Sequence, residues 1–321
     1  MSLFKRKQHE FGGLLLDKGL FRFVSLKGEP GSVEVVQTAF GSLPDDFDEG
    51  DPFADSGSKL ESVFSYVQSE TGALKMPVNV AIPTTDALLR IVPLPDLQPE
   101  EAKQAFRYDY ERYFPFSVDE AIYDLAPITY PMPGNVEEKR YIVASTRKDL
   151  IERLMDAADS QDIELGAIEP AQLALERAIT PKMAPSDAVV YVYAGRKNSV
   201  ITLSWKGNGI FYRVMSVGFG EKPQPFDSET APDDAVQYSF VKQVRSSLQF
   251  AVSQIRGFVP DAMYLYGPGS SDGLCALLKE AVDISTVIKA DPLHINGIEL
   301  NQADLEAGMW DIPIGLAMRF L

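Results

Sequence analysis

Few residues of this 321-residue chain have the types and spacing that catalysis requires. The two histidines, His9 and His294, lie far apart without zinc-ligand spacing, so no metal site is predicted. No serine stands in a nucleophile-elbow pattern, and no glycine-rich Walker loop ends in Lys-Ser or Lys-Thr. The single cysteine, Cys275, lies in an apolar stretch that favours a buried thiol over a nucleophile. The sequence therefore predicts no catalytic residue and no enzymatic activity.

Three glycine-containing turns are the next features that could carry chemistry. Gly19 follows Asp17 at the end of a strand-like segment, and Gly195 follows another. Gly267 and Gly269 flank a proline after a third. Asp and Gly are favoured in tight hairpin turns, so ordinary turn geometry explains each of these glycines without a ligand.

An aromatic segment lies near the middle of the chain. Pro99 begins a predicted helix on which Phe106, Tyr110 and Tyr113 form one stripe. Two interpretations stay open: the stripe packs as core, or it forms part of a groove that receives a short peptide. In the second interpretation the candidate partner-binding residues are Arg107, Tyr113, Pro115 and Phe116.

The composition narrows the class of partner. The chain has 46 acidic against 30 basic residues, a formal net charge of −16. This charge repels phosphate backbones, which argues against nucleic acid and favours partners with basic tails. No apolar run is long enough to span a membrane, and a lone cysteine suits a reducing cytoplasm.

Hydrophobic alternation predicts an α/β fold of two similar lobes around a cleft. Each lobe begins strand–turn–strand–turn–strand, and Lys27-Gly28 resembles Lys206-Gly207 at the second turn. If these turns are equivalent, the turn at Gly19 is tighter than the one at Gly195. We assign residues 1–180 to the first lobe and 186–321 to the second. A helix–strand–strand–helix insert is predicted at 96–161 of the first lobe.

Several motifs along the chain resemble the PilM family of type IV pilus assembly proteins. They are Arg90-Ile91-Val92-Pro93-Leu94-Pro95, the acidic aromatic helix ending in Tyr113-Phe114-Pro115-Phe116, Tyr123-Asp124, Ile168-Glu169-Pro170, and the final segment from Trp310 to Arg319. The resemblance spans nearly the whole chain in order. It implies an actin-like (ribonuclease H-like) fold with a small α+β insert in the first lobe.

The same resemblance implies where a nucleotide would bind. In actin-like ATPases two Asp-x-Gly loops and a glycine-rich turn hold MgATP, which here correspond to Asp17 and Gly19, to Gly195, and to Gly267 and Gly269. Leu20-Phe21 replaces the hydroxyl residues of the first loop, and Tyr193 stands where the second Asp is expected. We therefore expect no hydrolysis and no cofactor, with nucleotide binding without turnover left open. If the side chain of Arg22 or Phe21 enters the phosphate site, the chain itself closes that site to nucleotide.

The function that follows is a cytoplasmic adaptor at the inner face of the cytoplasmic membrane. PilM-like proteins hold the cytoplasmic N-terminus of a membrane-anchored partner, PilN, near the insert. The alternative is an actin-like ATPase that hydrolyses MgATP between the lobes. Proteins with other functions, similar to GspL of type II secretion or to the division protein FtsA, fit the C-terminal segment of this sequence less well. The choice between pilus and secretion system and the oligomeric state are left open by the sequence.

Overall fold

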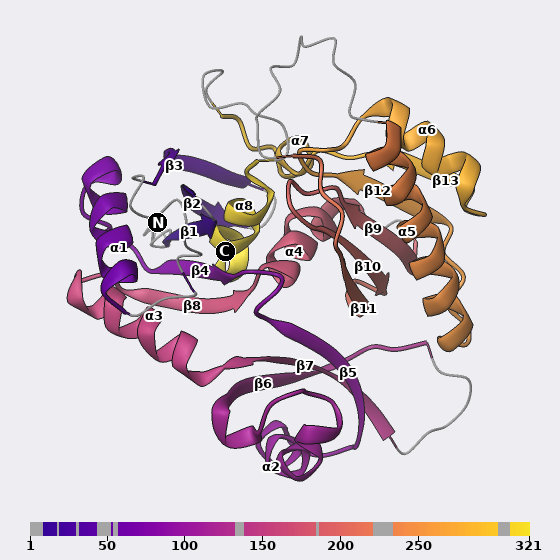
Figure 1. Ribbon diagram of the computed structural model, residues 1–321, viewed down its shortest axis with the longest axis horizontal. Helices are drawn as coiled ribbons and strands as arrows, with labels where there is room; N and C mark the ends of the chain where they lie inside the picture. The colour runs from indigo at the N-terminus through magenta and orange to yellow at the C-terminus, as the bar shows by residue number, and fades with distance from the viewer. Residues whose placement is uncertain are drawn as a thin grey trace, which may run out of the picture.

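The computed structural model describes residues 9–17, 19–29, 32–43, 53, 57–131, 138–183, 186–220, 234–300 and 309–321. These residues form two five-stranded sheets and one three-stranded sheet, with helices around and between them (Figure 1).

The first sheet has the strand order β3-β2-β1-β4-β8. Its strands are β1 (Glu10–Asp17), β2 (Leu20–Glu29), β3 (Ser32–Ser42), β4 (Val78–Ile82) and β8 (Leu165–Pro170). β1, β2 and β3 form an antiparallel meander, and β4 and β8 add in parallel. Asp17 pairs directly with Leu20, and Gly19 has a φ of 71°, which favours glycine. The tight first turn predicted from the sequence is confirmed.

The prediction of a turn at Lys27-Gly28 is wrong. β2 continues through both residues, and Gly28 pairs with Val33 of β3. The glycine after the alternating segment suggested a turn, but this glycine, with a φ of 142°, lies inside a strand. The equivalent turn of the second lobe is correct, because Lys206 and Gly207 adopt φ values of 51° and 79° between β10 and β11.

The outer face of the first sheet is covered by α1 (Gly57–Thr71) and α3 (Lys148–Ser160). Leu60, Val63 and Phe64 of α1 lie at helical spacing and are fully buried. They share one hydrophobic core with Phe21 of β2 and Leu154 of α3. Apolar periodicity along α1 therefore translates directly into the face that the helix buries.

The second sheet repeats the first, with the order β11-β10-β9-β12-β13. Its strands are β9 (Ala188–Tyr193), β10 (Ser199–Trp205), β11 (Asn208–Met215), β12 (Ala262–Tyr266) and β13 (Thr286–Lys289). The outer helices α5 (Asp234–Gln254) and α6 (Asp272–Ala281) bury Val244, Leu248, Leu274 and Leu278 against it. The matching strand orders confirm the predicted two-lobed architecture.

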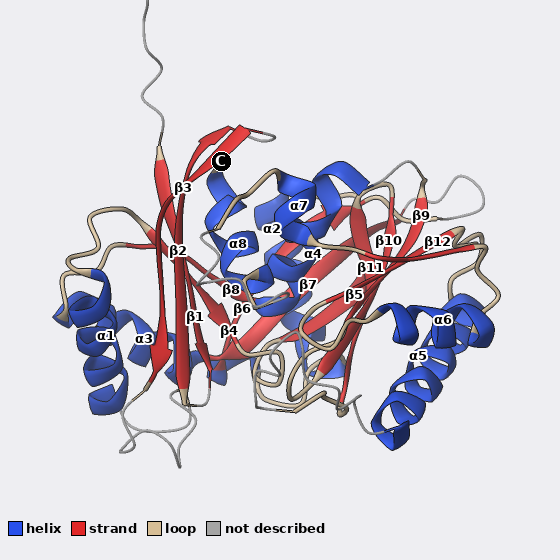
Figure 2. Cartoon of the chain, turned by 90° about the horizontal axis from the view of Figure 1, so that it is seen from above, coloured by secondary structure: helices blue, strands red, loops and turns tan. Residues whose placement is uncertain are grey.

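Two helices lie between the sheets: α4 (Ala171–Met183) and α8 (Asp311–Ala317), with α7 (Pro292–Asn296) beside them (Figure 2). α8 contacts β1 and β4 of the first sheet as well as α4. A Cβ on Gly13 would lie 2.0 Å from the Pro313 carbonyl oxygen, and one on Gly315 would lie 1.9 Å from that of Ala174. These glycines permit the close packing, which places α8 on the first sheet although its residues fall within 186–321.

The insert has different bounds from the predicted 96–161. Its sheet has the order β5-β7-β6, and the strands are β5 (Leu88–Pro95), β6 (Ala121–Ile128) and β7 (Glu138–Arg147). The helix α2 (Pro99–Asp109) and the short 3-10 turns Tyr110–Arg112 and Val118–Glu120 cover one face. β5 therefore belongs to the insert, whereas α3 packs on α1 in the first lobe. The sequence pattern identified each element but not the core in which it is buried.

Candidate functional site

The first turns of the two lobes meet at an ion pair. Asp17 ends β1, and Lys197 lies in the loop that connects β9 to β10. Lys197 Nζ lies 2.9 Å from Asp17 Oδ1. Both side chains are partly exposed, so the pair contributes at most about 1 kcal/mol of stability. Its chemical consequence is larger, because the carboxylate that corresponds to the first Asp-x-Gly loop of actin-like ATPases is engaged by a lysine of the chain itself.

Tyr193 occupies the centre of the second loop. Its ring lies 5.4 Å from that of Tyr266, and Cβ atoms on Gly195 or Gly267 would each approach it to 2.7 Å. Burial raises the pKa of Tyr193 well above its ordinary value, and the charges of Asp311 and Asp17 raise it further. This tyrosine therefore stays neutral at physiological pH and fills the space between the two glycine turns.

The turn after β12 is bonded to the same loop. The amide of Ala194 donates to the Tyr266 carbonyl at 2.8 Å, and the amide of Gly269 donates to the Ala194 carbonyl at 2.9 Å. The ring of Phe219 lies against Gly269, where a Cβ would come within 2.3 Å of it. The structure thus brings Gly195, Gly267 and Gly269 together, with the close approaches made by the chain's own side chains, while a nucleotide-binding role for them stays a prediction.

β2 presents alternate residues to the core and to the cleft. Phe21 is fully buried in the first-lobe core, with its ring 5.9 Å from that of Tyr66. Arg22, the next residue along β2, extends from the opposite face of the strand and is also buried, and its charge lowers the pKa of Tyr193. Of the two residues predicted to close the site, Arg22 is the one that lies near it.

Asp311, the first residue of α8, is a functional candidate that was not predicted from the sequence. Its side chain is 1% exposed, and its Oδ2 has no hydrogen-bond partner among the described residues. Burial, and secondarily the charge of Asp291, raises its pKa to about 8. The charge of Asp311 also raises the pKa values of Tyr193 and Tyr266. No local pattern marks this residue, because only the return of α8 between the sheets buries it.

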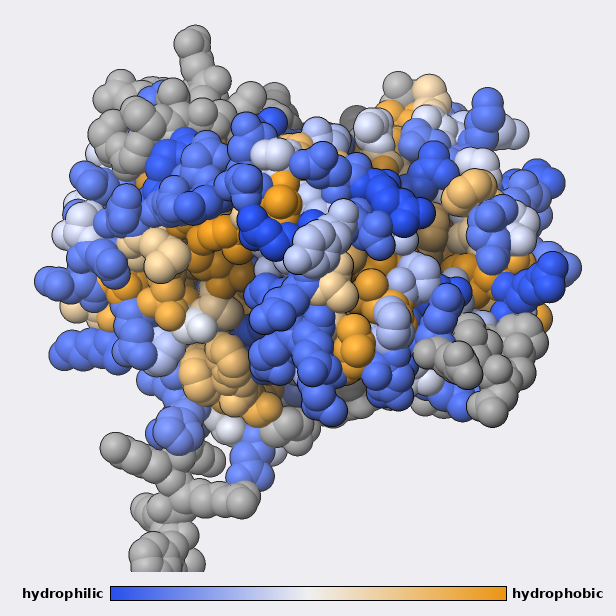
Figure 3. All heavy atoms as spheres, turned by 90° about the horizontal axis from the view of Figure 1, so that it is seen from below, coloured by the Kyte–Doolittle hydropathy of each residue, from blue (hydrophilic) through white to orange (hydrophobic). Residues whose placement is uncertain are grey.

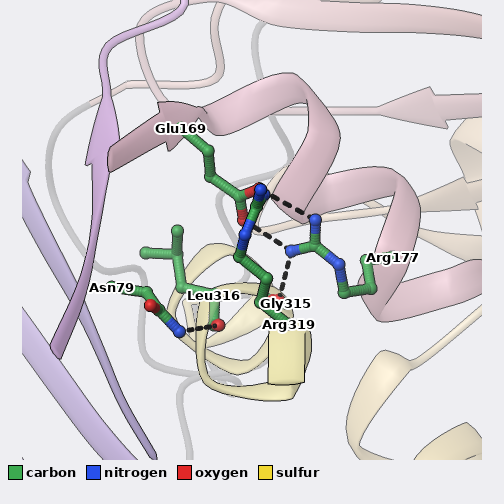
Figure 4. Close-up of polar contacts among 6 residues, drawn as sticks. All are labelled: Asn79, Glu169, Arg177, Gly315, Leu316 and Arg319. Carbon is green, nitrogen blue, oxygen red and sulfur yellow. Dashed lines mark hydrogen bonds and ion pairs between the residues drawn. The ribbon is translucent and has the colours of Figure 1, made fainter. Parts of the chain in front are cut away.

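α4 makes polar contacts to both lobes through adjacent residues. On one side Arg177 donates to both carboxylate oxygens of the buried Glu169, at 2.5 and 2.8 Å, and to the Gly315 carbonyl at 2.7 Å (Figure 4). Arg319 forms a second ion pair with Glu169. In the same view Asn79 Nδ2 donates to the carbonyl of α8 residue Leu316 at 2.8 Å. These contacts hold α8 against the first lobe.

On its other side α4 contacts β11 of the second lobe. The hydroxyl of Tyr212 donates to the buried carboxylate of Glu176. Burial raises the pKa of Glu176 to about 7, against the opposing effects of this hydrogen bond and of Arg177. α4 therefore links the two lobes through neighbouring buried carboxylate contacts.

A cavity of about 350 Å³ lies beside α4, between the insert and the second lobe. It is lined by Thr84, Thr85, Ala87, Leu88, Leu89, Arg90, Gln172, Tyr212, Arg213, Val214 and Ser216. Gln172 Nε2 donates to the carbonyls of Thr84 and Ala87, which fixes the wall that leads into β5. Figure 3 views the insert side of the molecule, where hydrophilic side chains cover most of the face between separate hydrophobic areas. We call this cavity the groove.

The four residues predicted to bind a partner lie in the insert and do not line the groove. Tyr113 and Phe116 pack in the aromatic cluster around Phe106 and Tyr110. Arg107 forms an exposed ion pair with Asp119 at 2.7 Å, and Pro115 is exposed. The core interpretation accounts for the two aromatics, while a binding role for any of the four stays a prediction.

Among known proteins, a profile of the family described as type IV pilus assembly protein PilM matches residues 21–222. The chain belongs to the PilM family. The motifs around the insert, which carried the resemblance in the sequence, fall inside this match. No curated protein matches the sequence significantly.

The fold agrees with the family. A solved PilM–PilN type IV pilus biogenesis complex is similar to this PilM-family chain with a TM-score of 0.75 and 19% identity, over 96% of this chain and 97% of the other. A protein of actin-like ATPase fold and unknown function from Bacteroides thetaiotaomicron gives 0.51 and 13%, over 93% and 100%. At these identities the likeness establishes the actin-like fold. In the described part of the chain no helix is long and apolar enough to cross a membrane.

Proposed function

We propose that this PilM-family chain is a non-enzymatic adaptor of the type IV pilus assembly machine. The observation that carries the proposal is the Asp17–Lys197 ion pair across the cleft, together with the packing of Tyr193 and Phe219 onto the glycine turns. Phosphates would have to approach backbone amides at these turns. The Gly269 amide already donates to Ala194. The residues at the glycine turns therefore do not fit MgATP, and the proposed function includes no chemical step that uses MgATP.

The chemistry of Tyr193 supports the same proposal. A metal-assisted hydrolysis needs an ionised oxygen ligand at this position, and carboxylates provide one at neutral pH. The raised pKa of Tyr193 keeps its hydroxyl protonated. Together with the engaged Asp17, this leaves neither predicted Asp position with a free carboxylate.

The partner we propose is the cytoplasmic tail of a PilN-like inner-membrane protein. The similar solved structure is of a complex of PilM with PilN, and family membership makes the same assembly role the economical one for this chain. The groove supports a peptide ligand, because its volume is in the range of ligand pockets and strand edges flank it. Binding such a tail would hold the chain at the inner face of the cytoplasmic membrane.

Calorimetry tests both parts of this proposal. A synthetic peptide of the partner's N-terminal cytoplasmic segment is titrated into the full chain, with a sequence-scrambled peptide as control. Saturable binding of the first peptide alone is expected. MgATP at millimolar concentration is expected to leave the melting temperature unchanged, whereas a site filled to 100 times its Kd would add about 2.7 kcal/mol. A clear MgATP shift, or no peptide binding, contradicts the corresponding part.

The alternative function, an actin-like ATPase, has one specific observation in its favour. Asp17 and Gly19 keep the Asp-x-Gly pattern at a cleft-facing turn. Phosphate release from MgATP, compared between the wild type and Asp17→Asn, decides between the two. Turnover that disappears in the variant establishes the ATPase, and equal background in both proteins supports the adaptor.

A further inference from the structure

The groove differs in charge from the rest of this acidic chain. Its charged lining residues are Arg90 of the insert and Arg213 of the second lobe, and no described carboxylate is among them. Both arginines are exposed, and neither forms an ion pair with another described residue. Two carboxylates that adjoin lining residues are engaged: Asp86 accepts a hydrogen bond from Thr85 at 2.9 Å, and Glu176 accepts one from Tyr212. A net charge of −16 makes this local excess of positive charge distinctive.

The two arginines come from strand edges that face each other. β5 pairs only with β7, and β11 pairs only with β10, among the described residues. The outer edges of β5 and β11 approach one another at the groove. Unpaired backbone groups along a strand edge bind extended peptides by strand addition. The edges therefore favour an extended occupant, and the arginines favour one that carries negative charge.

We propose that the groove binds an extended segment of the partner's tail through an acidic side chain, whose carboxylate is held between Arg90 and Arg213. This inference rests on the proposed function, because it names the chemistry by which the tail is recognised. Arginine's planar fork of donors suits a carboxylate, and charge-assisted hydrogen bonds are among the strong ones. Because one arginine belongs to the insert and the other to the second lobe, the bound carboxylate bridges the two. The acidic surface attracts basic residues elsewhere in the tail, and the groove selects the acidic one.

The test measures binding of the partner's N-terminal cytoplasmic peptide to the full chain. Arg90→Glu and Arg213→Glu are each expected to weaken binding about 10- to 100-fold. Arg245→Glu is the matched control, since Arg245 is an exposed arginine on α5 outside the groove and the change in net charge is the same. The control is expected to bind as the wild type does. Melting curves of all three variants establish that the exposed substitutions leave the fold intact.

The tail supplies the reciprocal test. Replacing each acidic residue of the peptide by its amide should identify one position that weakens binding as the arginine variants do. Changing that acid to lysine should restore binding to Arg213→Glu. If the peptide binds the wild type and neither arginine variant weakens it, this inference is overturned while the adaptor function stands. If no tail peptide binds, both are overturned. Competition by inorganic phosphate, with no effect of any amide substitution, would assign the arginines to a phosphate and overturn the carboxylate.

Discussion

Asp311→Asn is the substitution whose effect the structure specifies most closely. A carboxyl with an ordinary pKa of 3.8 is ionised in the unfolded chain at neutral pH, whereas Asp311 in the folded chain keeps its proton up to about pH 8. Between these values the folded state binds one proton more than the unfolded state. The free energy of unfolding therefore falls by about 1.4 kcal/mol for each pH unit as pH rises. Above about pH 8 the loss is complete, at roughly 6 kcal/mol as an upper bound.

Asparagine removes this dependence while keeping the shape of the side chain. Relative to the wild type, the variant should lose stability at pH 5, because the buried amide offers donors that find no partner. Its relative stability should then rise with pH and exceed that of the wild type at pH 8.5. The expected change in the difference between the two proteins is about 2–4 kcal/mol over this range.

Urea unfolding of both proteins at pH 5, 6.5, 7.5 and 8.5 measures this difference. Other titrating groups, Glu176 included, are common to both proteins and cancel. Asp291→Asn is a second variant, because it removes the charge that adds to the raised pKa of Asp311. It should lower the pH at which this loss of stability ends, because only the folded-state pKa of Asp311 changes. A difference between wild type and Asp311→Asn that stays constant over the whole range would refute the reasoning.

Three further predictions concern α4 and α8. Gly315→Ala should lower the free energy of unfolding in urea by about 2–3 kcal/mol or more, because its Cβ would meet the α4 backbone. The control Gly273→Ala on α6 should be neutral or slightly stabilising. Equal effects of the two substitutions would contradict the close packing. Arg177→Ala should cost about 2–4 kcal/mol, and adding Glu169→Gln should recover part of that loss by removing the undercompensated buried charge. Glu176→Gln should gain stability relative to the wild type as pH rises from 4.5 to 7, by up to about 3 kcal/mol, so a flat difference in unfolding free energy would exclude the raised pKa.

The sequence predicted best where local patterns determine the structure. The helical spacing of Leu60, Val63 and Phe64 marks the buried face of α1, and the repeated strand pattern predicts the two similar lobes that the matching sheets form. Both predictions rest on hydrophobic periodicity, which a few neighbouring residues determine. The resemblance to PilM, carried by the motifs around the insert, was confirmed by the family match.

The rest depends on contacts between residues distant in the chain. Lys197 pairs with Asp17 across 180 positions, and Asn79 binds the backbone of Leu316 across 237. Neither the lysine of a loop nor the asparagine of a strand has a local pattern that specifies its partner. The insert was bounded wrongly for the same reason, because α3 has the amphipathic pattern of a surface helix whichever core it joins. Aromatic density drew attention to Tyr113 and Phe116, which pack inside the insert.

The position of α4 connects the groove with the cleft. Gln172 and Tyr212 are walls of the groove, and Tyr212 also holds Glu176 of α4. The next residue of α4, Arg177, binds the Gly315 carbonyl of α8, whose first residue, Asp311, is buried and raises the pKa of Tyr193. A ligand that displaces Tyr212 must break its hydrogen bond to Glu176 or carry α4 with it, because a buried carboxylate without its donor is costly. A ligand bound in the groove that displaces Tyr212 would therefore act on the cleft through α4.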